Sequence, residues 1–131
     1  MGEHLINKDE EFEINFFEGL LEKKPDFIDA LHALGDLYTR NRLYQKGLEV
    51  DRELEILCPD DPVVFYNLAC SYSLLNRIDE SYRTFKMAIR RGYDDVDHME
   101  HDSDLDNLKK DSRFLRYYSK VKSRTLNIPH S

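Results

Sequence analysis

Apolar residues recur at helical spacing along most of the chain, and the alternation typical of strands is nearly absent. The first such segment predicts a helix over residues 9–23. It carries two adjacent apolar stripes, made up of Phe12, Phe16 and Leu20 and of Phe17 and Leu21. The pattern as a whole therefore predicts an all-α fold.

Four more helices are predicted after this one, each bounded by turn residues. Pro25 closes the first helix, and Asp26 is expected to cap a second helix that carries apolar residues from Phe27 to Tyr38. A third helix is expected over residues 44–57. The short polar turns between the helices make consecutive helices antiparallel neighbours.

The next pair of helices has clear start and stop signals. Asp60-Asp61-Pro62 places carboxylates and a proline at the start of a fourth helix, which runs to about Leu75. The fifth is expected from Asp79 to about Arg91, where Gly92 is well placed as a stop.

Two stretches of the chain match at an offset of 34 residues. Leu31-x-x-Leu34-Gly35-x-x-Tyr38 corresponds to Phe65-x-x-Leu68-Ala69-x-x-Tyr72, and Leu54 falls on Ala88. The turn Asn41-Arg42-Leu43 corresponds to Leu75-Asn76-Arg77 with a stagger of one residue, and Pro25 and Pro59 also stand one period apart. A period of about 34 residues with these residue types is typical of stacked helix–turn–helix units.

A third copy is degraded. Residues 94–102 could begin a helix, and Asp104 and Asp111 are each positioned as the cap of a later, short helix. Phe114, Leu115, Tyr118 and Val121 then predict a last amphipathic helix with a basic outer face. A polar terminal unit is what the end of a repeat stack requires, because nothing stacks on it.

The chain resembles the tetratricopeptide repeat (TPR) proteins over residues 9–124. The ending Asp104-Leu105-x-x-Leu108-x-x-Asp111-Ser112-Arg113-Phe114 is similar to a bacterial variant with a degenerate C-terminal repeat, in which Pro usually stands where this chain has Ser112. The resemblance implies a right-handed superhelix of antiparallel helix pairs with a concave groove, no catalytic residue and no cofactor. It divides a single domain, 1–131, into a half-repeat helix (9–24), two repeats (25–59 and 60–93), a degenerate repeat with a capping helix (94–124) and a flexible tail (125–131).

The resemblance also implies where a partner would bind. The first helix of each pair lines the groove, and the residues expected there are Asp29, His32, Asp36 and Thr39, followed by Val63, Tyr66, Asn67, Cys70 and Ser73, with Asp97 and His101 from the degraded copy. Some TPR grooves use a basic clamp to bind an acidic C-terminus; of its positions only Asn67 matches here. The expected ligand is therefore a protein or peptide of basic or apolar character.

Asp51 stands where the second helix of a repeat usually carries an aromatic residue. An unpaired buried carboxylate is costly, so it must reach solvent or find a donor. We expect Val50 and Leu54 to carry the packing and Asp51 to lean outward.

The N-terminal helix corresponds to the second half of a repeat whose first half is absent. Several of its apolar side chains, among them Phe12, Ile14, Phe16 and Leu21, would lack a partner. Leu5 and Ile6 could fold back over them, a second copy or another protein could cover them, or the helix could shift. A dimer contact through Phe12 and Phe16, which would make the chain a self-associating structural unit, is the alternative to groove binding.

The formal net charge of −7 and pI near 5.2 argue against binding to nucleic acid or to anionic membranes. Residues 94–106 hold seven carboxylates and no Lys or Arg, whereas residues 109–124 hold seven basic residues and one acidic residue. The basic segment could bind nucleic acid or an acidic protein, but attraction between the two segments is the preferred interpretation.

Neither the cysteines nor the N-terminus points away from a cytoplasmic protein. Cys58 and Cys70 have no metal-type spacing and fit a reducing compartment. No secretory signal and no apolar run long enough to span a bilayer is present.

Residues of metal-ligand type gather at one place, comprising His98, Glu100, His101, Asp102 and Asp104. Their order matches no recognised hydrolase motif, and an acidic, solvated loop is the preferred interpretation. No glycine-rich phosphate loop is present. The sequence therefore predicts a protein-interaction module, an adaptor or regulatory subunit, that is not an enzyme and holds no metal.

Overall fold

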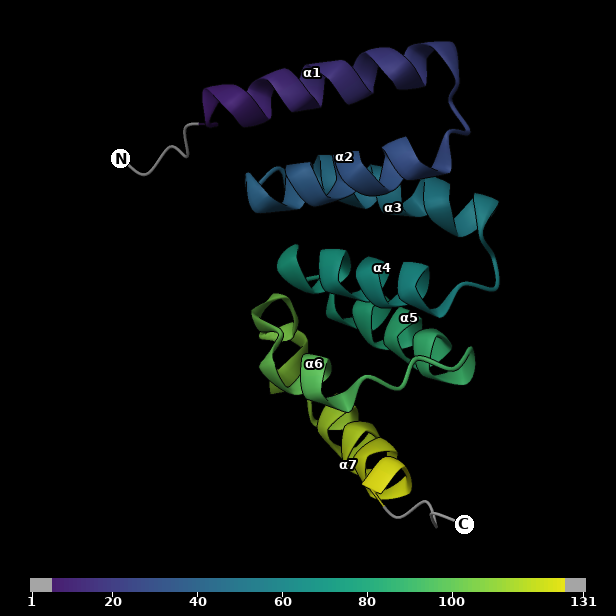
Figure 1. Cartoon of the computed structure of the whole chain (residues 1–131). Helices are drawn as coiled ribbons and strands as arrows, with labels where there is room; N and C mark the ends of the chain where they lie inside the picture. The colour runs from purple at the N-terminus through teal and green to yellow at the C-terminus, as the bar shows by residue number, and fades with distance from the viewer. Residues whose placement is uncertain (1–5, 127–131) are drawn as a thin grey trace.

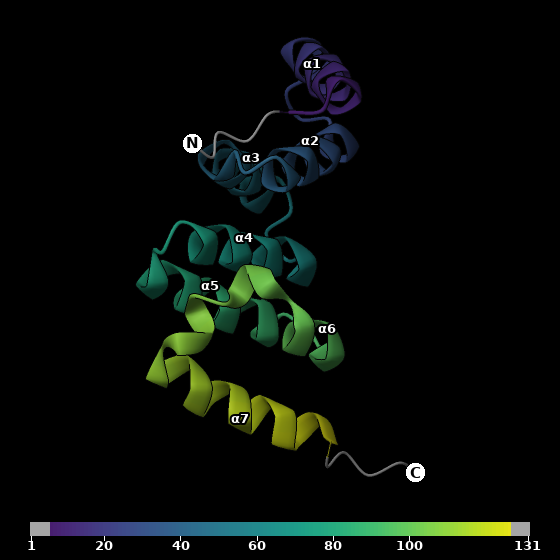
Figure 2. The same ribbon diagram turned by 90° about the vertical axis from the view of Figure 1, so that its left-hand side faces the viewer.

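The computed structural model describes residues 6–126, and within this range every regular element is helical, which confirms the all-α prediction. The α-helices are α1 (Lys8–Lys23), α2 (Ile28–Arg40), α3 (Tyr44–Leu57), α4 (Pro62–Leu74), α5 (Ile78–Arg90), α6 (Val96–His101) and α7 (Ser112–Leu126). Two short 3-10 turns, η1 (Ser103–Leu105) and η2 (Leu108–Lys110), join α6 to α7. The helices lie in successive layers, with α1 at one end of the molecule and α7 at the other (Figures 1 and 2).

The turn between α4 and α5 repeats the geometry of the turn between α2 and α3. Arg42 and Asn76, which stand one period apart, both adopt the left-handed conformation, with φ of 62° and 58°. In each turn the next residue donates a backbone hydrogen bond of 2.8 Å, from Leu43 to Tyr38 and from Arg77 to Tyr72. The two turns therefore correspond residue for residue, and the predicted one-residue stagger is wrong.

From α1 to α5 the helix boundaries follow the sequence signals closely, with one exception. Asp61 caps α4 through the backbone N–H of Val63 at 2.9 Å, with Pro62 at the first helical position. Gly92 has φ of 104° just after α5 and ends it as predicted. However, Phe27 rather than Asp26 precedes α2, and no side chain caps that helix.

Two large clusters of buried side chains connect the layers, and a third, smaller cluster of Leu48, Leu68 and Tyr72 joins α3 to α4. The first joins α1, α2, α3 and the start of α4 and comprises Ile14, Leu31, Leu34, Leu37, Tyr38, Val50, Leu54 and Val64. The second joins α4 and α5 to α6, the two turns and α7, and comprises Phe65, Tyr66, Ala69, Cys70, Phe85, Ala88, Met99, Leu105, Leu108, Phe114 and Tyr118. The segment after α5 thus completes the core of the layer before it.

The prediction that apolar side chains of the N-terminal helix lack a partner within the chain is confirmed for only some of them. Ile14 is buried, and Phe17, Leu21 and Ile6 pack against the same cluster. Phe12 and Phe16 remain 72% and 53% exposed. Leu5 lies outside the described residues.

The C-terminal cap differs from expectation in three places. Asp102 rather than Asp104 caps η1, whereas Asp111 accepts from the backbone of Arg113 at 2.8 Å and caps α7 as predicted. Leu115 is 50% exposed and does not belong to the buried stripe. The helix includes Thr125, which was predicted to belong to the tail, and residues 127–131 lie outside the described residues.

The acidic and basic segments do contact each other. Lys122 Nζ lies 3.0 Å from Glu100 Oε1, and the Tyr118 hydroxyl donates to the same carboxylate at 2.6 Å. Lys109 Nζ donates to the carbonyls of Glu100 and Asp102. These contacts fasten α7 and η2 to α6 and the residue that follows it. Across residues 6–126, none of the helices combines the length and apolar character needed to span a membrane.

Candidate binding site

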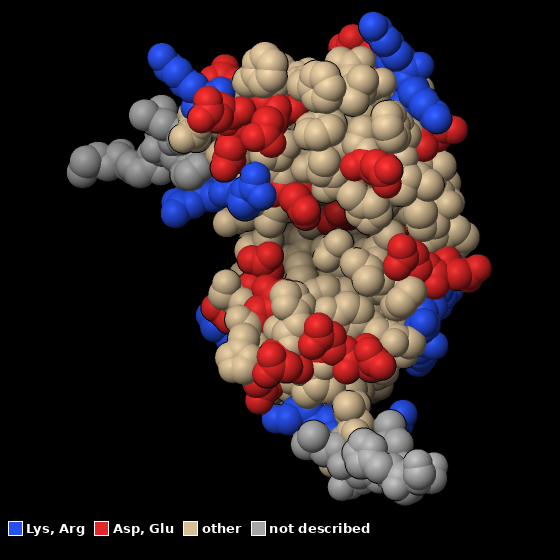
Figure 3. Space-filling model, viewed as in Figure 1, with Lys and Arg blue, Asp and Glu red and all other residues tan. Residues whose placement is uncertain are grey.

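A hollow of about 340 Å³ opens between α2, α4 and the segment formed by α6 and η1. Figure 3 shows the recess, with carboxylate side chains on both sides of it. It is lined by His32, Gly35, Asp36, Thr39, Arg40, Asp51, Leu54, Asn67, Cys70, Ser71, His98, Asp102 and Asp104. The helices that carry these residues are held by the buried clusters, so the walls of the hollow belong to the packed part of the molecule.

Five of the residues predicted for the groove line this hollow, namely His32, Asp36, Thr39, Asn67 and Cys70. Asp29 is exposed on α2 but lies outside the hollow. Ser73 is fully buried, and its hydroxyl accepts the backbone N–H of Leu108 at 3.1 Å. Ser73 therefore fastens the cap rather than facing a ligand.

Tyr66 and Val63 line a second recess of about 370 Å³ beside the first, which also includes Asn67 and His98. Tyr66 is only 2% exposed, since its ring stacks on Tyr93 with centroids 4.2 Å apart. The two recesses share Asn67 and His98, so they form adjoining parts of one surface.

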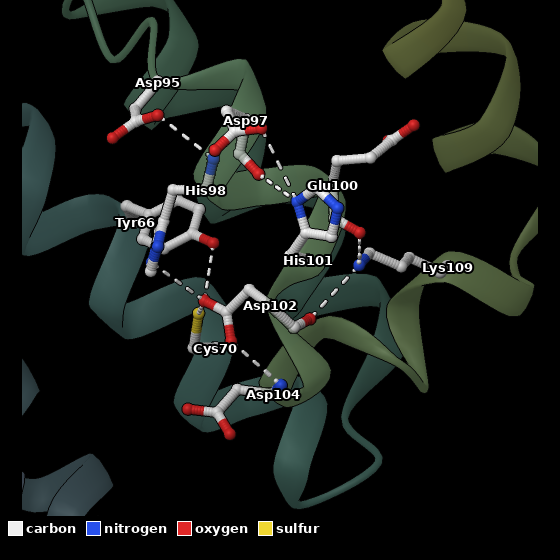
Figure 4. A network of polar contacts seen from close by, with 10 residues as sticks. All are labelled: Tyr66, Cys70, Asp95, Asp97, His98, Glu100, His101, Asp102, Asp104 and Lys109. Carbon is white, nitrogen blue, oxygen red and sulfur yellow. Dashed lines mark hydrogen bonds and ion pairs between the residues drawn. The ribbon is translucent and has the colours of Figure 1, made fainter.

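Asp102 joins the cap to α4 through a network of polar contacts (Figure 4). Its Oδ2 accepts from the Tyr66 hydroxyl at 2.6 Å and the Cys70 thiol at 3.6 Å, and lies 3.3 Å from His98 Nε2. Its Oδ1 accepts the backbone N–H of Asp104 at 3.0 Å. The Asp102 side chain is only 12% exposed, so the prediction that it belongs to a solvated loop is wrong.

The residues of the degraded copy that reach the hollow are not those predicted. His98, Asp102 and Asp104 line it, whereas Asp97 and His101 are exposed outside it and contact each other, with His101 Nδ1 3.6 Å from Asp97 Oδ1. The reason is that α6 is only 6 residues long and the chain turns into η1, so the helical spacing on which the prediction rested does not continue. The acidic composition of this segment was the available signal, but it did not indicate which carboxylates turn inward.

Asp51 also differs from its prediction, because it points inward. The side chain is buried and accepts a hydrogen bond from the Ser71 hydroxyl of α4. Burial raises the pKa of Asp51 to about 7, and the nearby Asp36 carboxylate contributes to this rise, although the hydrogen bond from Ser71 favours the charged form. Val50 and Leu54 carry the packing as predicted.

The hollow is lined mainly by acidic and hydrogen-bonding groups. Four carboxylates face it, on Asp36, Asp51, Asp102 and Asp104, and Arg40 supplies the one Lys or Arg among these described lining residues. Burial raises the pKa of Asp104, and the neighbouring Asp102 raises it further. A surface of this kind attracts cationic groups and offers them hydrogen-bond acceptors.

The chemistry of the lining residues gives no sign of a nucleophile or a metal centre. Burial raises the pKa of the Cys70 thiol well above its usual value, and Asp102 adds to this effect, so the reactive thiolate is disfavoured. Among the residues that the structure describes, no three His, Cys, Asp or Glu side chains are grouped so that they could hold a metal ion.

No protein-family model matches the chain. The chain is similar to a chloroplastic protein from Arabidopsis thaliana, with 30% identity over 83 residues that cover 59% of this chain. The chain spans only 24% of the length of that protein. This share is too small to place the chain in the same family.

Proposed function

We propose that the chain is a TPR-like α-solenoid that acts as a non-catalytic protein-interaction module. In this proposal the helix pairs α2–α3 and α4–α5 are two repeats, and α6, η1, η2 and α7 form a degenerate repeat that caps the stack. The recurrence of the left-handed turn at Arg42 and Asn76 supports this division. The ligand is a basic segment of a partner protein, bound in the concave groove along α2, α4 and α6.

The observation that carries the proposal is the charge of the hollow. Its carboxylates come from three separate parts of the chain, on α2, α3 and the α6–η1 segment. Carboxylates brought together in this way repel one another, and a bound Lys or Arg side chain relieves that repulsion. Asn67, half-buried in the wall, offers an amide that can hydrogen-bond a peptide backbone.

A peptide-binding experiment with matched charge variants tests the proposal. We expect a randomised peptide library passed over the immobilised protein to be enriched in Lys and Arg. Asp36→Lys, inside the hollow, should weaken the binding of the selected peptides by at least about tenfold, because a second cation replaces an attractive charge. Asp29→Lys makes the same charge change on the same helix outside the hollow and should have little effect. Tyr66 is a poor target, since its burial makes its removal a change in stability.

The measurement is fluorescence anisotropy of labelled peptides at two salt concentrations. Binding should weaken as salt rises, because the contacts are electrostatic. The proposal fails if no peptide is enriched, if acidic peptides are enriched instead, or if the two variants weaken binding equally.

A further inference from the structure

The two ends of the molecule expose helices of opposite net charge. The outer face of α1 presents Phe12 and Phe16, which point away from the buried Ile14. Six exposed charged residues accompany these rings along the helix, four acidic (Asp9, Glu11, Glu13 and Glu22) and two basic (Lys8 and Lys23), so the exposed charge of α1 is net negative. Two large aromatic side chains in water favour association, because the burial of apolar surface is its main driving force.

The outer face of α7 has the complementary character. Leu115 is 50% exposed there, and the exposed Arg116, Lys120 and Arg124 follow along the same helix. Two other basic residues of this helix contact carboxylates of the same chain. Lys122 contacts Glu100, and Arg113 contacts Asp79 and Asp111. Ser119 and Ser123, both exposed, keep the rest of this face shallow, so that large rings can approach it.

We propose that two copies of this chain associate head to tail, with α1 of one copy on α7 of the next. In this contact Phe12 and Phe16 pack on Leu115 and the serine-lined surface, and Arg116 can stack on an aromatic ring. The acidic residues of α1 face the basic residues of α7. The two faces lie at opposite ends of the molecule (Figures 1 and 2). Each copy in a dimer therefore keeps one unused face, and further copies can add to form a short rod.

The charges select this arrangement over a symmetric one. A contact between two α1 helices would bring together two helices whose exposed charge is net negative, even with Lys8 and Lys23 counted, and a contact between two α7 helices would oppose two basic faces. Like charges placed opposite each other disfavour both contacts. The net charge of −7 also repels neighbouring copies, so association should require the local attraction of the two ends.

Sedimentation velocity of the full chain over a wide concentration range tests the proposal. The sedimentation coefficient of the wild type should increase with concentration. The α1 variant, Phe12→Ser/Phe16→Ser, and the α7 variant, Arg116→Glu/Lys120→Glu, should each remain monomeric at every concentration. All four replaced side chains are exposed, and circular dichroism should give the wild-type helix content for both variants.

The decisive sample is a mixture of the two variants. The α1 variant keeps an intact α7 face and the α7 variant an intact α1 face, so the mixture should form a one-to-one dimer that grows no further. A wild type that stays monomeric, an α7 variant that associates like the wild type, or a mixture that stays monomeric would each overturn the proposal. Asp36→Lys should not change association, because the hollow involves neither α1 nor α7. Failure of this proposal therefore leaves groove binding untouched.

Discussion

At the scale of single residues, Asp51 is the most unusual position. Its carboxylate is buried between α3 and α4, where the Ser71 hydroxyl donates to it and the Asp36 carboxylate lies close enough to raise its pKa. One hydrogen bond from a neutral hydroxyl compensates little of the cost of burying a charge. The side chain is thus near its titration point at neutral pH, and its ionisation opposes folding.

Asp51→Asn should remove a pH dependence of stability between about pH 4 and 7. The native pKa of about 7 lies above the ordinary value of 3.8, so the native state binds more protons in this window. Stability of the wild type therefore falls as pH rises through the window, by up to about 1.4 kcal/mol per pH unit from this group. Urea unfolding of wild type and variant at several pH values measures the difference, which should grow towards neutral pH in favour of the variant and then level off.

The exposed Asp29 on α2 provides the control for this measurement. Asp29→Asn removes one exposed carboxylate and leaves the buried contact between Asp51 and Ser71 unchanged. Its profile should run parallel to that of the wild type. A wild-type profile that matches the Asp51→Asn profile across the window would contradict the buried, titrating state of Asp51.

The sequence could not predict that the Asp51 side chain turns inward, and the reason is physical. Ser71 lies 20 residues further along the chain and in the next layer, so no local pattern connects it to Asp51. The inward turn of Asp102 escaped prediction for the same reason, because its hydrogen-bond partner Tyr66 lies 36 residues away. By contrast, His32, Asp36 and Asn67 could be placed, since a spacing of four residues puts His32 and Asp36 on one face of α2 and the resemblance implies that α2 and α4 line one groove.

At the scale of elements, the turn after α2 recurs after α4 with the same left-handed conformation. Arg42 occupies this conformation in the first turn and Asn76 in the second. Left-handed backbone is costly for Arg but tolerated by Asn, whose short side chain clashes less. Most helix ends were predictable to within about a residue or two because such turn residues and caps act locally, whereas the uncapped start of α2 at Phe27 carries no such signal.

Arg42→Gly should stabilise the protein by about 0.5–1 kcal/mol, since glycine adopts φ of 62° without a steric penalty. Asn76→Gly should gain less. Gly92→Ala should act in the opposite direction: an added Cβ would meet no atom within 4 Å, but φ of 104° strains any side chain. Thermal unfolding of the three variants measures this order, and a loss of stability on Arg42→Gly would contradict it.

At the scale of the whole molecule, the two ends are built very differently. The C-terminal end is completed by a cap whose Phe114 and Tyr118 share a cluster with Phe85 of α5. At the other end α1 contributes a single buried side chain, Ile14, whereas α4 in the middle contributes nine. Polar contacts supplement this burial between α1 and α2, among them Tyr38 with Glu18 and Arg40 with Glu10.

This asymmetry predicts that α1 opens before the rest of the fold. Local opening requires only the contacts of one helix to be lost, so in dilute solution the backbone amides of α1 should exchange with deuterium well before those of α4. Ile14→Ala should speed exchange in α1 strongly and leave α4 nearly unchanged, whereas Phe12→Ala should change neither in the monomer. Peptide-resolved mass spectrometry measures both regions in one sample. Equal protection of α1 and α4 in dilute solution would contradict the view that α1 is the weakly held end.

If two copies dock head to tail as proposed, raising the protein concentration should slow exchange in α1 of the wild type but not of the Phe12→Ser/Phe16→Ser variant.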